Sequence, residues 1–334
     1  MSEVQMLTLD QAADRLLATL SPVFVMHNRP DGDTCGSAAA LLRLCRTLGK
    51  PAAAVCIDPI PDRLAFIFKP GEVLPLPLSG AHEIIPVDVA SPQQLGLLKN
   101  SLTGPYTPVL MIDHHGVGTP FCDCYLEPDA PAAGGLVFKL ACRLVERGDL
   151  PALPTEVVEA CFTALSSDTG CFKFSNATAE AHFLAAQMMQ LCPTLDTADI
   201  NLRLFDSKSL STLRAEAFAG ANLEVSEDGK IAWLTVSAAD RADFKLNEED
   251  FETAIDVVRS LRGVEVAFTI KENREGKFKA SLRSTGFNVA NVAAAFDGGG
   301  HDRAAGCAVR GAADIQDAVD RVLAVIRTQQ AAQA

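Results

Sequence analysis

The 334-residue chain has little of several features that would place it in a special class of protein. No apolar run reaches the ~18 residues that a membrane helix needs. The first twenty residues are interrupted by Asp10, Asp14 and Arg15, so this segment predicts an amphipathic helix rather than a signal peptide. We therefore expect a cytoplasmic protein without a membrane partner.

Basic residues are also scarce, with 29 Lys and Arg against 42 Asp and Glu and a net charge of -13. Neutralisation of phosphates by basic side chains dominates affinity for long nucleic acids, so this balance disfavours such a partner. Residues 271–310 differ, because they carry seven basic against four acidic side chains, a local surplus of +3. This surplus suits a small anionic ligand better than a long polymer.

Cysteines with metal-binding spacing are lacking as well. The ten cysteines are scattered, and the close pair Cys122 and Cys124 has no second Cys or His pair near it in the sequence. A structural zinc site is therefore disfavoured, and we expect reduced, mostly buried thiols. What the chain does have is a hydrophobic content of 48%, ample for buried cores, and a length that predicts about two domains.

From Pro22 to Gly170, strand-like runs alternate with helix-like runs, which is typical of an α/β domain. The predicted fold is α/β, with an N-terminal, mainly parallel sheet flanked by helices and a smaller C-terminal α+β domain. The expected strands are 22–26, 51–57, 84–87 and 108–112, and the expected helices are 37–49, 61–68, 131–146, 155–165 and 178–191.

A different pattern follows the break at Cys192 and Pro193. Residues 199–218 predict a connecting helix, and the runs 223–225, 231–236, 264–270 and 277–282 predict strands joined by hairpin turns. We divide the chain into an N-terminal domain of residues 1–192, a linker helix region of residues 193–217, and a C-terminal domain of residues 218–334.

Four short segments contain candidate metal ligands, and three of them directly follow apolar runs predicted as buried strands. In open parallel sheets ligands bind at the carboxyl ends of the strands, so we expect these segments to converge there. A lone aspartate in such a place is more often a helix cap or turn residue, so the prediction depends on the combination. The candidate ligands are His27, Asp31, Asp33, Asp88, His114 and Asp168.

Six ligands are too many for one tetrahedral ion but suit two ions that share a bridging carboxylate. The high share of carboxylates and the absence of thiolates favour Mn²⁺, with Mg²⁺, Co²⁺ or Fe²⁺ as alternatives. Paired ions about 3.5–4 Å apart clamp the attacking and leaving oxygens of a phosphoryl displacement. The pattern therefore predicts metal-assisted hydrolysis of a phosphate ester.

A glycine-rich run in the C-terminal domain predicts an anion-binding loop. Three consecutive glycines end at Gly300, where the backbone can approach a ligand and direct N–H groups at an anion. A glycine run alone is often a plain turn, but here His301 follows it directly. The planar guanidinium of Arg283, in the preceding strand, suits bidentate binding of phosphate. The candidate substrate-binding residues are Arg283, Ser284, Gly299, Gly300 and His301.

Over residues 20–190, the segments HNRPDGD, PVDVAS, IDHH and SSDTG resemble, in order, the four motifs of the DHH phosphoesterase superfamily. The resemblance implies that His27 and Asp31 hold one ion, that Asp33, His114 and Asp168 hold the other, and that Asp88 bridges them. It also implies catalytic roles for two further residues. Asp113 would orient the motif, and His115 would face the phosphate and assist charge stabilisation or proton transfer.

Residues 215–330, with the SLRS segment and the glycine run, resemble the DHH-associated domain of nanoRNases. This resemblance implies an exonuclease-type phosphodiesterase and phosphatase that binds its substrate between two domains. Its substrates would be very short RNA and 3′-phosphoadenosine 5′-phosphate, attacked by a hydroxide activated between two ions. One departure concerns Ala290, which stands where relatives often have asparagine.

Other readings stay open from the sequence. Cleavage of cyclic dinucleotides or of their linear products needs the same chemistry. A pyrophosphatase is disfavoured because its Ser-Arg-Lys-Lys-Gln motif is missing, and a RecJ-type exonuclease would need extra domains. A non-catalytic nucleotide-binding regulator would have lost metal ligands, and none is lost here. The sequence leaves the cleavage direction and a homodimer undecided.

Overall fold

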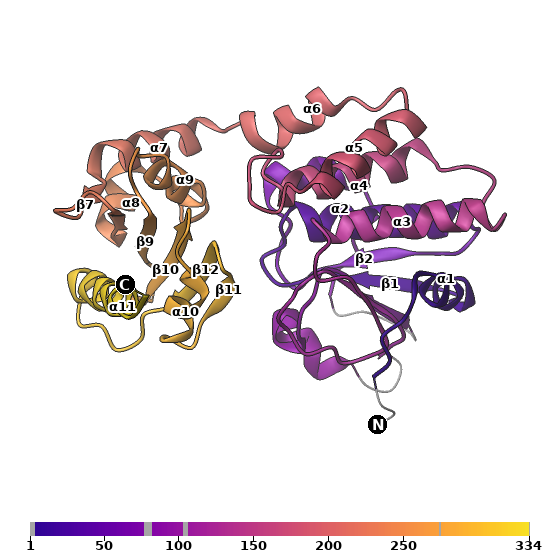
Figure 1. Cartoon of the computed structure of the whole chain (residues 1–334), viewed down its shortest axis with the longest axis horizontal. Helices are drawn as coiled ribbons and strands as arrows, with labels where there is room; N and C mark the ends of the chain where they lie inside the picture. Colours follow the sequence, from indigo (N-terminus) through magenta and orange to yellow (C-terminus); the bar gives the residue numbers. More distant parts are fainter. Residues whose placement is uncertain (1–3, 77–81, 103–105, 274, 334) are drawn as a thin grey trace. The chain divides into compact units, whose positions relative to one another are not determined.

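The computed structural model describes residues 4–76, 82–102, 106–273 and 275–333, and the chain divides into two compact units, Met1–Ser207 and Lys208–Ala334 (Figure 1). The division falls within the predicted linker region. The expected helix over 199–218 is wrong, because the chain forms α6 (Thr197–Asn201), a π-helical turn η3 (Leu202–Asp206) and then α7 (Leu210–Asn222). Ser209 separates them by capping α7, where its side chain accepts the Thr212 N–H.

Unit 1 contains a parallel sheet. Its strand order is β2-β1-β3-β4, and β5 and β6 form a further parallel pair that an isolated bridge from Val87 to Ile112 connects to β3. The expected strand over 108–112 is split, with its two parts pairing with different neighbours. The strands are β1 (Pro22–Val25), β2 (Ala53–Val55), β3 (His82–Pro86), β4 (Tyr106–Pro108), β5 (Met111–Asp113) and β6 (Cys124–Leu126).

Alternate strand residues of unit 1 serve two cores. Phe24 and Ile85 face the large core under the helices, whereas Val23 and Ile84 face a small core with Leu95 of η2. Figure 1 shows α2 to α5 gathered on one side of β1 and β2. The helices are α1 (Leu9–Ala18), α2 (Gly32–Thr47), α3 (Ala133–Glu146), α4 (Thr155–Asp168) and α5 (Ala179–Leu191), with 3-10 segments η1 (Asp62–Ile67) and η2 (Pro92–Ser101).

Unit 2 is built on one six-stranded sheet of order β11-β12-β10-β9-β8-β7. One face packs on α10 and α11 through residues such as Phe268 and Val322, and the other packs on α7 and α9 through residues such as Ala267 and Phe218. Its strands are β7 (Glu224–Val225), β8 (Ile231–Val236), β9 (Val266–Glu272), β10 (Phe278–Ser284), β11 (Gly299–His301) and β12 (Ala304–Ala308). Its remaining helices are α8 (Ala238–Phe244), η4 (Glu249–Phe251), α9 (Ala254–Arg259), α10 (Val289–Ala294) and α11 (Ile315–Gln333).

The predicted fold class is confirmed in both units. A further local expectation differs from the structure: the glycine-rich run is no loop, because Gly299–His301 forms an edge strand paired with β12. In the part of the chain that the structure describes, no helix is long and apolar enough to cross a membrane.

Candidate functional site

Asp31 is positioned by the start of α2. The helix begins at Gly32, five residues earlier than the sequence pattern indicated, and Asp31 is its N-cap. The Oδ1 of Asp31 accepts the N–H groups of Asp33 at 2.9 Å and Thr34 at 3.1 Å. Its Oδ2 is left to face the Nε2 of His27 at 3.7 Å. The same residue is thus both a helix cap and a candidate ligand.

Close packing of α2 on α4 brings two further carboxylates together. A Cβ at Gly32 would lie 2.2 Å from the Oγ of Ser167, and one at Gly36 would lie 2.6 Å from the carbonyl oxygen of Ala160. Larger residues would therefore force the helices apart. Because the helices touch here, Asp33 near the start of α2 lies beside Asp168, the last residue of α4.

Asp33 is held by the N-terminus of a third helix. Its carboxylate accepts the N–H groups of Ala133 at 2.7 Å and Gly134 at 2.9 Å, at the start of α3, and the hydroxyl of Ser37 at 3.1 Å. These contacts satisfy N–H groups that the N-cap residue Ala132 leaves without a side-chain partner, and the helix dipole favours a negative charge there. Asp33 is 1% exposed.

Asp88 stands between two histidines. Its Oδ2 lies 3.5 Å from the Nε2 of His27, and its Oδ1 lies 3.5 Å from the Nε2 of His114. The side chain is buried, and Oδ1 has no hydrogen-bond partner among the described residues. The backbone has a φ of 58°, a left-handed conformation that costs a non-glycine residue roughly 1 kcal/mol or more. An orphaned oxygen on a strained, buried residue indicates that a cation belongs there.

The two histidines present their lone pairs to these carboxylates. The Nδ1 of His27 lies 2.9 Å from the carbonyl oxygen of Asn28, and the Nδ1 of His114 lies 3.0 Å from that of Ala130. A carbonyl only accepts, so each Nδ1 donates its proton and each neutral ring has an unprotonated Nε2. This is the arrangement in which histidine binds metals, with the second nitrogen fixed by the backbone.

Charge in the cluster is unbalanced without added cations. Burial lowers the pKa of His27, but hydrogen bonds and charges from Asp31 and Asp88 outweigh it and raise the pKa to about 12. Burial likewise opposes the raised pKa of His114, about 11, which follows from its carboxylate neighbours. For Asp168, burial is the main cause of a pKa raised to about 7. A proton or a metal ion must therefore supply positive charge.

The donor set fits divalent cations. Three groups each have ligand atoms within 4.8 Å of one another, and they contain only nitrogen and oxygen donors. Asp88 belongs to the groups with His27 and with His115, and its Oδ1 lies 3.5 Å from the Nε2 of His114, which also belongs to the group with Asp33, so it is placed to act as a bridging carboxylate. The structure thus brings together all six candidate ligands predicted from the sequence. The groups are His27 with Asp31 and Asp88, Asp33 with His114 and Asp168, and Asp88 with His114 and His115.

His115 and Asp113 form a hydrogen-bonded pair beside this centre. The Nδ1 of His115 lies 2.7 Å from the Oδ1 of Asp113 and 3.5 Å from the Oδ1 of Asp88. Burial opposes protonation of His115, but Asp113 and Asp88 outweigh it and raise its pKa. The buried Asp113 therefore fixes the ring and stabilises its charged form.

Asn176 is a site residue that the sequence reading missed. Its Nδ2 donates to the Oδ2 of Asp168 at 3.0 Å, to the carbonyl oxygen of Asp168 at 3.1 Å and to that of Pro131 at 3.0 Å. All three partners accept, so they determine which way the amide points. Between the two residues the chain reverses through left-handed Gly170, Cys171 and Phe172. Such a turn leaves no regular spacing in the sequence, so the segment SNAT, residues 175–178, did not indicate a site residue.

In unit 2, strand register places three of the predicted substrate-binding residues on one sheet face. Arg283 pairs with Ala304, which pairs with His301, and the next row contains Ser281, Gly306 and Gly299. Residues directly opposite one another share a face. Only small residues therefore separate Arg283 from His301.

Two predicted residues lie on the other face of this sheet. Ser284 is 6% exposed and its hydroxyl donates to the carbonyl oxygen of Phe287. Gly300 has a φ of 141°, and a Cβ there would lie 2.4 Å from the carbonyl oxygen of Ala304. Glycine at position 300 is therefore required by the backbone conformation and by the close packing of the strands. At Gly299, by contrast, a Cβ would meet nothing within 4 Å, so protein packing does not require this glycine.

Arg283 has the properties of an anion-binding group. It is half-buried, and one guanidinium nitrogen donates to the carbonyl oxygen of Leu282 at 3.0 Å. Within the described ranges, no carboxylate lies close enough to form an ion pair with it. Burial lowers its pKa. A partly desolvated guanidinium with unused donors suits a phosphate.

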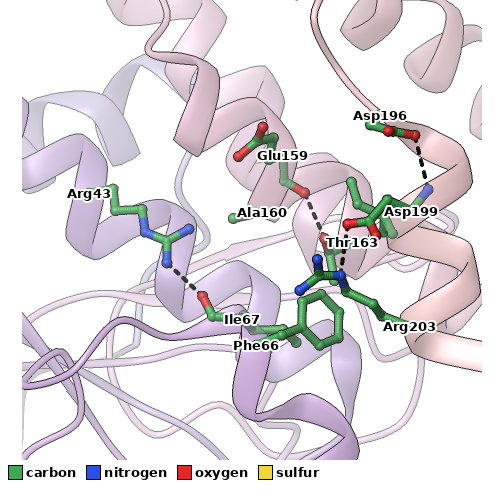
Figure 2. Close-up of a pocket in the computed structure, with 10 residues that line it drawn as sticks. Arg43, Phe66, Ile67, Glu159, Ala160, Thr163, Asp196, Asp199 and Arg203 are labelled. Atoms are coloured by element: carbon green, nitrogen blue, oxygen red, sulfur yellow. Dashed lines mark hydrogen bonds and ion pairs between the residues drawn. The ribbon is translucent and has the colours of Figure 1, made fainter. Parts of the chain in front are cut away.

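A separate pocket of about 210 Å³ lies between α2, α4, η1 and α6 in unit 1 (Figure 2). None of the candidate ligands lines it. Arg203 pairs with Asp199 at 2.7 Å and lies over the ring of Phe66, 5.5 Å from its centroid. Arg43 pairs with Glu72 at 2.9 Å. With its arginines already paired, this pocket is a weaker candidate than the metal centre.

Comparisons with known proteins identify the family. The model of the DHH family, N-terminal domain, matches residues 22–165, and that of the DHHA1 domain matches residues 228–328. The bifunctional oligoribonuclease and PAP phosphatase NrnA of Thermus thermophilus is 30% identical over 95% of this chain and 93% of that protein. The chain belongs to the DHH family. The resemblance inferred from the motifs is therefore confirmed, and the protein is a hydrolytic phosphoesterase.

Two further proteins extend the likeness. The NrnA of Bacillus subtilis is 24% identical over 90% of this chain and 92% of its own. The structure of an exopolyphosphatase-related protein from Bacteroides fragilis has a TM-score of 0.84 and 23% identity, covering 96% of this chain and 95% of that one. This second likeness concerns the fold alone. DHH phosphoesterases depend on metal ions, in keeping with the cluster around Asp88.

Proposed function

We propose that the protein hydrolyses very short oligoribonucleotides and 3′-phosphoadenosine 5′-phosphate with the help of two Mn²⁺ ions. The observation that carries the proposal is the place of Asp88, whose Oδ2 lies 3.5 Å from the Nε2 of His27 in one donor group and whose Oδ1 lies 3.5 Å from the Nε2 of His114 in the other. The relatives from Thermus thermophilus and Bacillus subtilis, named as oligoribonucleases and PAP phosphatases, support the choice of substrates.

His27 and Asp31 would hold one ion, Asp33, His114 and Asp168 the other, and Asp88 both. Carboxylate and imidazole donors without thiolates favour Mn²⁺, and Mg²⁺, Co²⁺ or Fe²⁺ would be alternatives. When bound, such ions polarise phosphoryl oxygens and lower the pKa of water. The caps and backbone hydrogen bonds of Asp31, Asp33, His27 and His114 keep the ligand atoms in place before any ion arrives.

His115 would act on the reacting phosphate. Asp113 accepts the Nδ1 proton of this ring and, against the effect of burial, raises its pKa, which favours a proton on the other nitrogen, Nε2. An imidazolium there would stabilise negative charge on the phosphoryl oxygens or donate a proton to the leaving oxygen. Asp113 would act through His115.

Unit 2 would bind a phosphate of the substrate that is not being hydrolysed. Arg283 and His301 flank a floor of Ala304, with Gly299 beside it, and Ser281 replaces the inward-facing Ser284 on this face. A guanidinium, an imidazole and exposed strand-edge backbone recognise phosphate without needing a particular base. Short substrates with two or more phosphates would gain most from such a face.

A turnover panel tests the proposal. The metal-depleted protein, reloaded with Mn²⁺, should hydrolyse a 5′-phosphorylated diribonucleotide and 3′-phosphoadenosine 5′-phosphate. Cyclic di-AMP and pyrophosphate in the same panel should be poor substrates. Preferred hydrolysis of either of these two would contradict the proposed function, and the Asp88→Asn variant controls for contaminating hydrolases.

A further inference from the structure

Arg29 has a strained backbone in the loop between β1 and α2. Its φ of 54° is left-handed, a conformation that residues other than glycine, asparagine and aspartate rarely adopt. Pro30 follows it, and a residue before a proline prefers an extended backbone. Glycine or asparagine would fit this position with less strain, so the backbone gives no reason for an arginine here.

The backbone of Arg29 is held in place beside the candidate metal centre. Its N–H donates to the Oδ2 of Asp58 at 2.7 Å, and the next residue, Pro30, is buried. The candidate ligands His27 and Asp31 lie two residues before and two residues after Arg29. The side chain of Arg29 therefore starts from a fixed point between two candidate ligands.

Backbone strain gathers around these ligands. Among the residues that the structure describes, six other than glycine have a left-handed φ. Four of the six are Arg29, Asp88, and Cys171 with Phe172 in the turn that follows Asp168. Such strain persists at functional sites, where the position of a side chain outweighs its cost. Asp88 and the turn have roles in the centre, and Arg29 is left to be explained.

The guanidinium of Arg29 is exposed and makes no hydrogen bond or ion pair with the described residues. Other arginines of unit 1 are matched with carboxylates. Arg15 pairs with Asp123 at 2.5 Å. Arg43 pairs with Glu72 at 2.9 Å. The fork of Arg29 thus keeps all its donors for a ligand.

The centre needs a further cation to attract a phosphate. Its six candidate ligands include four carboxylates, whose charge two divalent ions would cancel. The additional carboxylate of Asp113 pairs with His115. The loaded centre would therefore be close to neutral, whereas a phosphate ester brings at least one negative charge. An arginine at its edge supplies the positive charge that is lacking.

We propose that Arg29 is a further catalytic residue, whose guanidinium binds two oxygens of the phosphate that is hydrolysed. The planar fork of arginine suits bidentate binding of a phosphoryl group, and its charge stabilises the negative charge that develops on those oxygens. The inference rests on the proposed two-ion centre but not on the proposed substrates. Arg283, by contrast, would bind a phosphate that is not hydrolysed.

The first test compares bis(4-nitrophenyl) phosphate, which has one phosphate and no nucleobase, with a 5′-phosphorylated diribonucleotide. With Mn²⁺, Arg29→Ala should lower kcat/KM about tenfold to a hundredfold on both, through loss of a charge-assisted contact. Arg29→Lys should recover only part of the loss, because an ammonium group lacks the fork that binds two oxygens. Arg283→Ala should affect the diribonucleotide more than the aryl ester.

Arg15→Ala is the matched control, because Arg15 lies on α1 and is already paired with Asp123 at 2.5 Å. It should leave both efficiencies unchanged. A loss for Arg29→Ala that is confined to the diribonucleotide would place Arg29 against another part of the substrate and overturn the proposal. Wild-type protein that hydrolyses the aryl ester but neither proposed nucleotide would contradict the proposed function, and the aryl ester would still decide the role of Arg29.

The second test measures binding and folding without turnover. Inorganic phosphate is titrated by calorimetry into Mn²⁺-loaded Arg283→Ala protein, which lacks the phosphate-binding arginine of unit 2. Adding Arg29→Ala should weaken phosphate binding about tenfold, with the metal content unchanged. Equal phosphate affinity would overturn the proposal.

Arg29→Asn separates the side chain from the backbone. Asparagine tolerates a left-handed conformation, so the metal-free variant should unfold no earlier than the metal-free wild type, although its turnover falls as in Arg29→Ala. A clearly lower unfolding midpoint, or a loss of bound metal, would show that Arg29 serves the fold or the ions instead, and would overturn the proposal.

Discussion

Unit 1 gathers carboxylates at one point, whereas unit 2 gathers cations on one sheet face. In unit 1, the carboxylates of Asp31 and Asp33 are oriented by helix N-termini, and Asp88 is left with an orphaned oxygen. In unit 2, Arg283 has no ion pair among the described side chains, and the small residue Ala304 lies opposite it on the neighbouring strand. The charge of each arrangement is not balanced by neighbouring side chains, so we expect each to bind a ligand of opposite charge.

The two units also differ in the interactions that fix the positions of their site residues. Helix caps, close helix packing and backbone hydrogen bonds hold the metal centre, so its geometry is tightly determined before any ion binds. Strand register and residues with small side chains define the face in unit 2, and this leaves room for substrates of different size. We therefore expect substitutions in unit 1 to remove catalysis and substitutions in unit 2 to change substrate affinity and selectivity.

The largest effect is expected for Asp88. Asp88→Asn should lower kcat/KM roughly a thousandfold, because a loss of preorganised electrostatic stabilisation is commonly of that size. Asparagine tolerates the left-handed backbone at this position, so the metal-free variant should unfold no earlier than the metal-free wild type. Asp88→Ala should be equally inactive but less stable by about 1 kcal/mol. Activity above a small fraction of wild type would contradict the bridging role.

Arg283→Ala should weaken substrate binding without affecting metal binding. We expect KM to rise about tenfold to a hundredfold, since a charge-assisted hydrogen bond contributes roughly 1.5–3 kcal/mol. The metal content should remain two ions per chain by elemental analysis, and His301→Ala should behave alike. Arg310→Ala, in the same unit and exposed, is the control. Loss of bound metal in either variant would show that these residues serve the metal centre.

Substrate length should separate the two units' contributions. Turnover of 5′-phosphorylated RNA should fall steeply between about 2 and about 20 nucleotides, because the acidic surface offers no counterion release to a longer strand. The fall should appear in KM, measured at fixed ionic strength. Efficiency that stays flat or rises with length would indicate a processive exonuclease instead.

A smaller effect is expected for Asn176. Asn176→Ala should weaken metal binding about tenfold to a hundredfold, as removal of an outer partner of a metal ligand commonly does. Calorimetric titration of Mn²⁺ into the metal-free protein would measure it. Asn176→Asp should weaken binding or stability further, because a carboxylate cannot donate to the three oxygens around it. Unchanged affinity in both variants would remove Asn176 from the site.

The sequence predicted the parts of this protein that follow from local pattern. Apolar runs predicted four strand segments of unit 1, and five of the six candidate ligands directly follow such runs, whereas Asp168 ends the helix α4. The position of α2 was missed because Gly32 and Asp33 are weak helix formers, and their place is decided by packing on α4. Asn176 was missed because a left-handed turn returns it to Asp168.

In unit 2, the residue types were predicted but their faces were not. Ser284 seemed to belong with Arg283 because they are neighbours in sequence, whereas the pleat of β10 turns Ser284 inward and brings Ser281 to the face instead. The glycine run suggested a loop, and its pairing with β12 depends on long-range register. Lys271 and Lys279 come together through the register of the β9–β10 hairpin.

The most direct test of the central claim is a crystal structure of the protein with Mn²⁺, with the ions located by anomalous scattering. The account predicts two anomalous peaks about 3.5–4 Å apart, both in contact with Asp88. His27 and Asp31 should bind one ion, and Asp33, His114 and Asp168 the other. A single ion, or two ions without a shared Asp88 oxygen ligand, would contradict it.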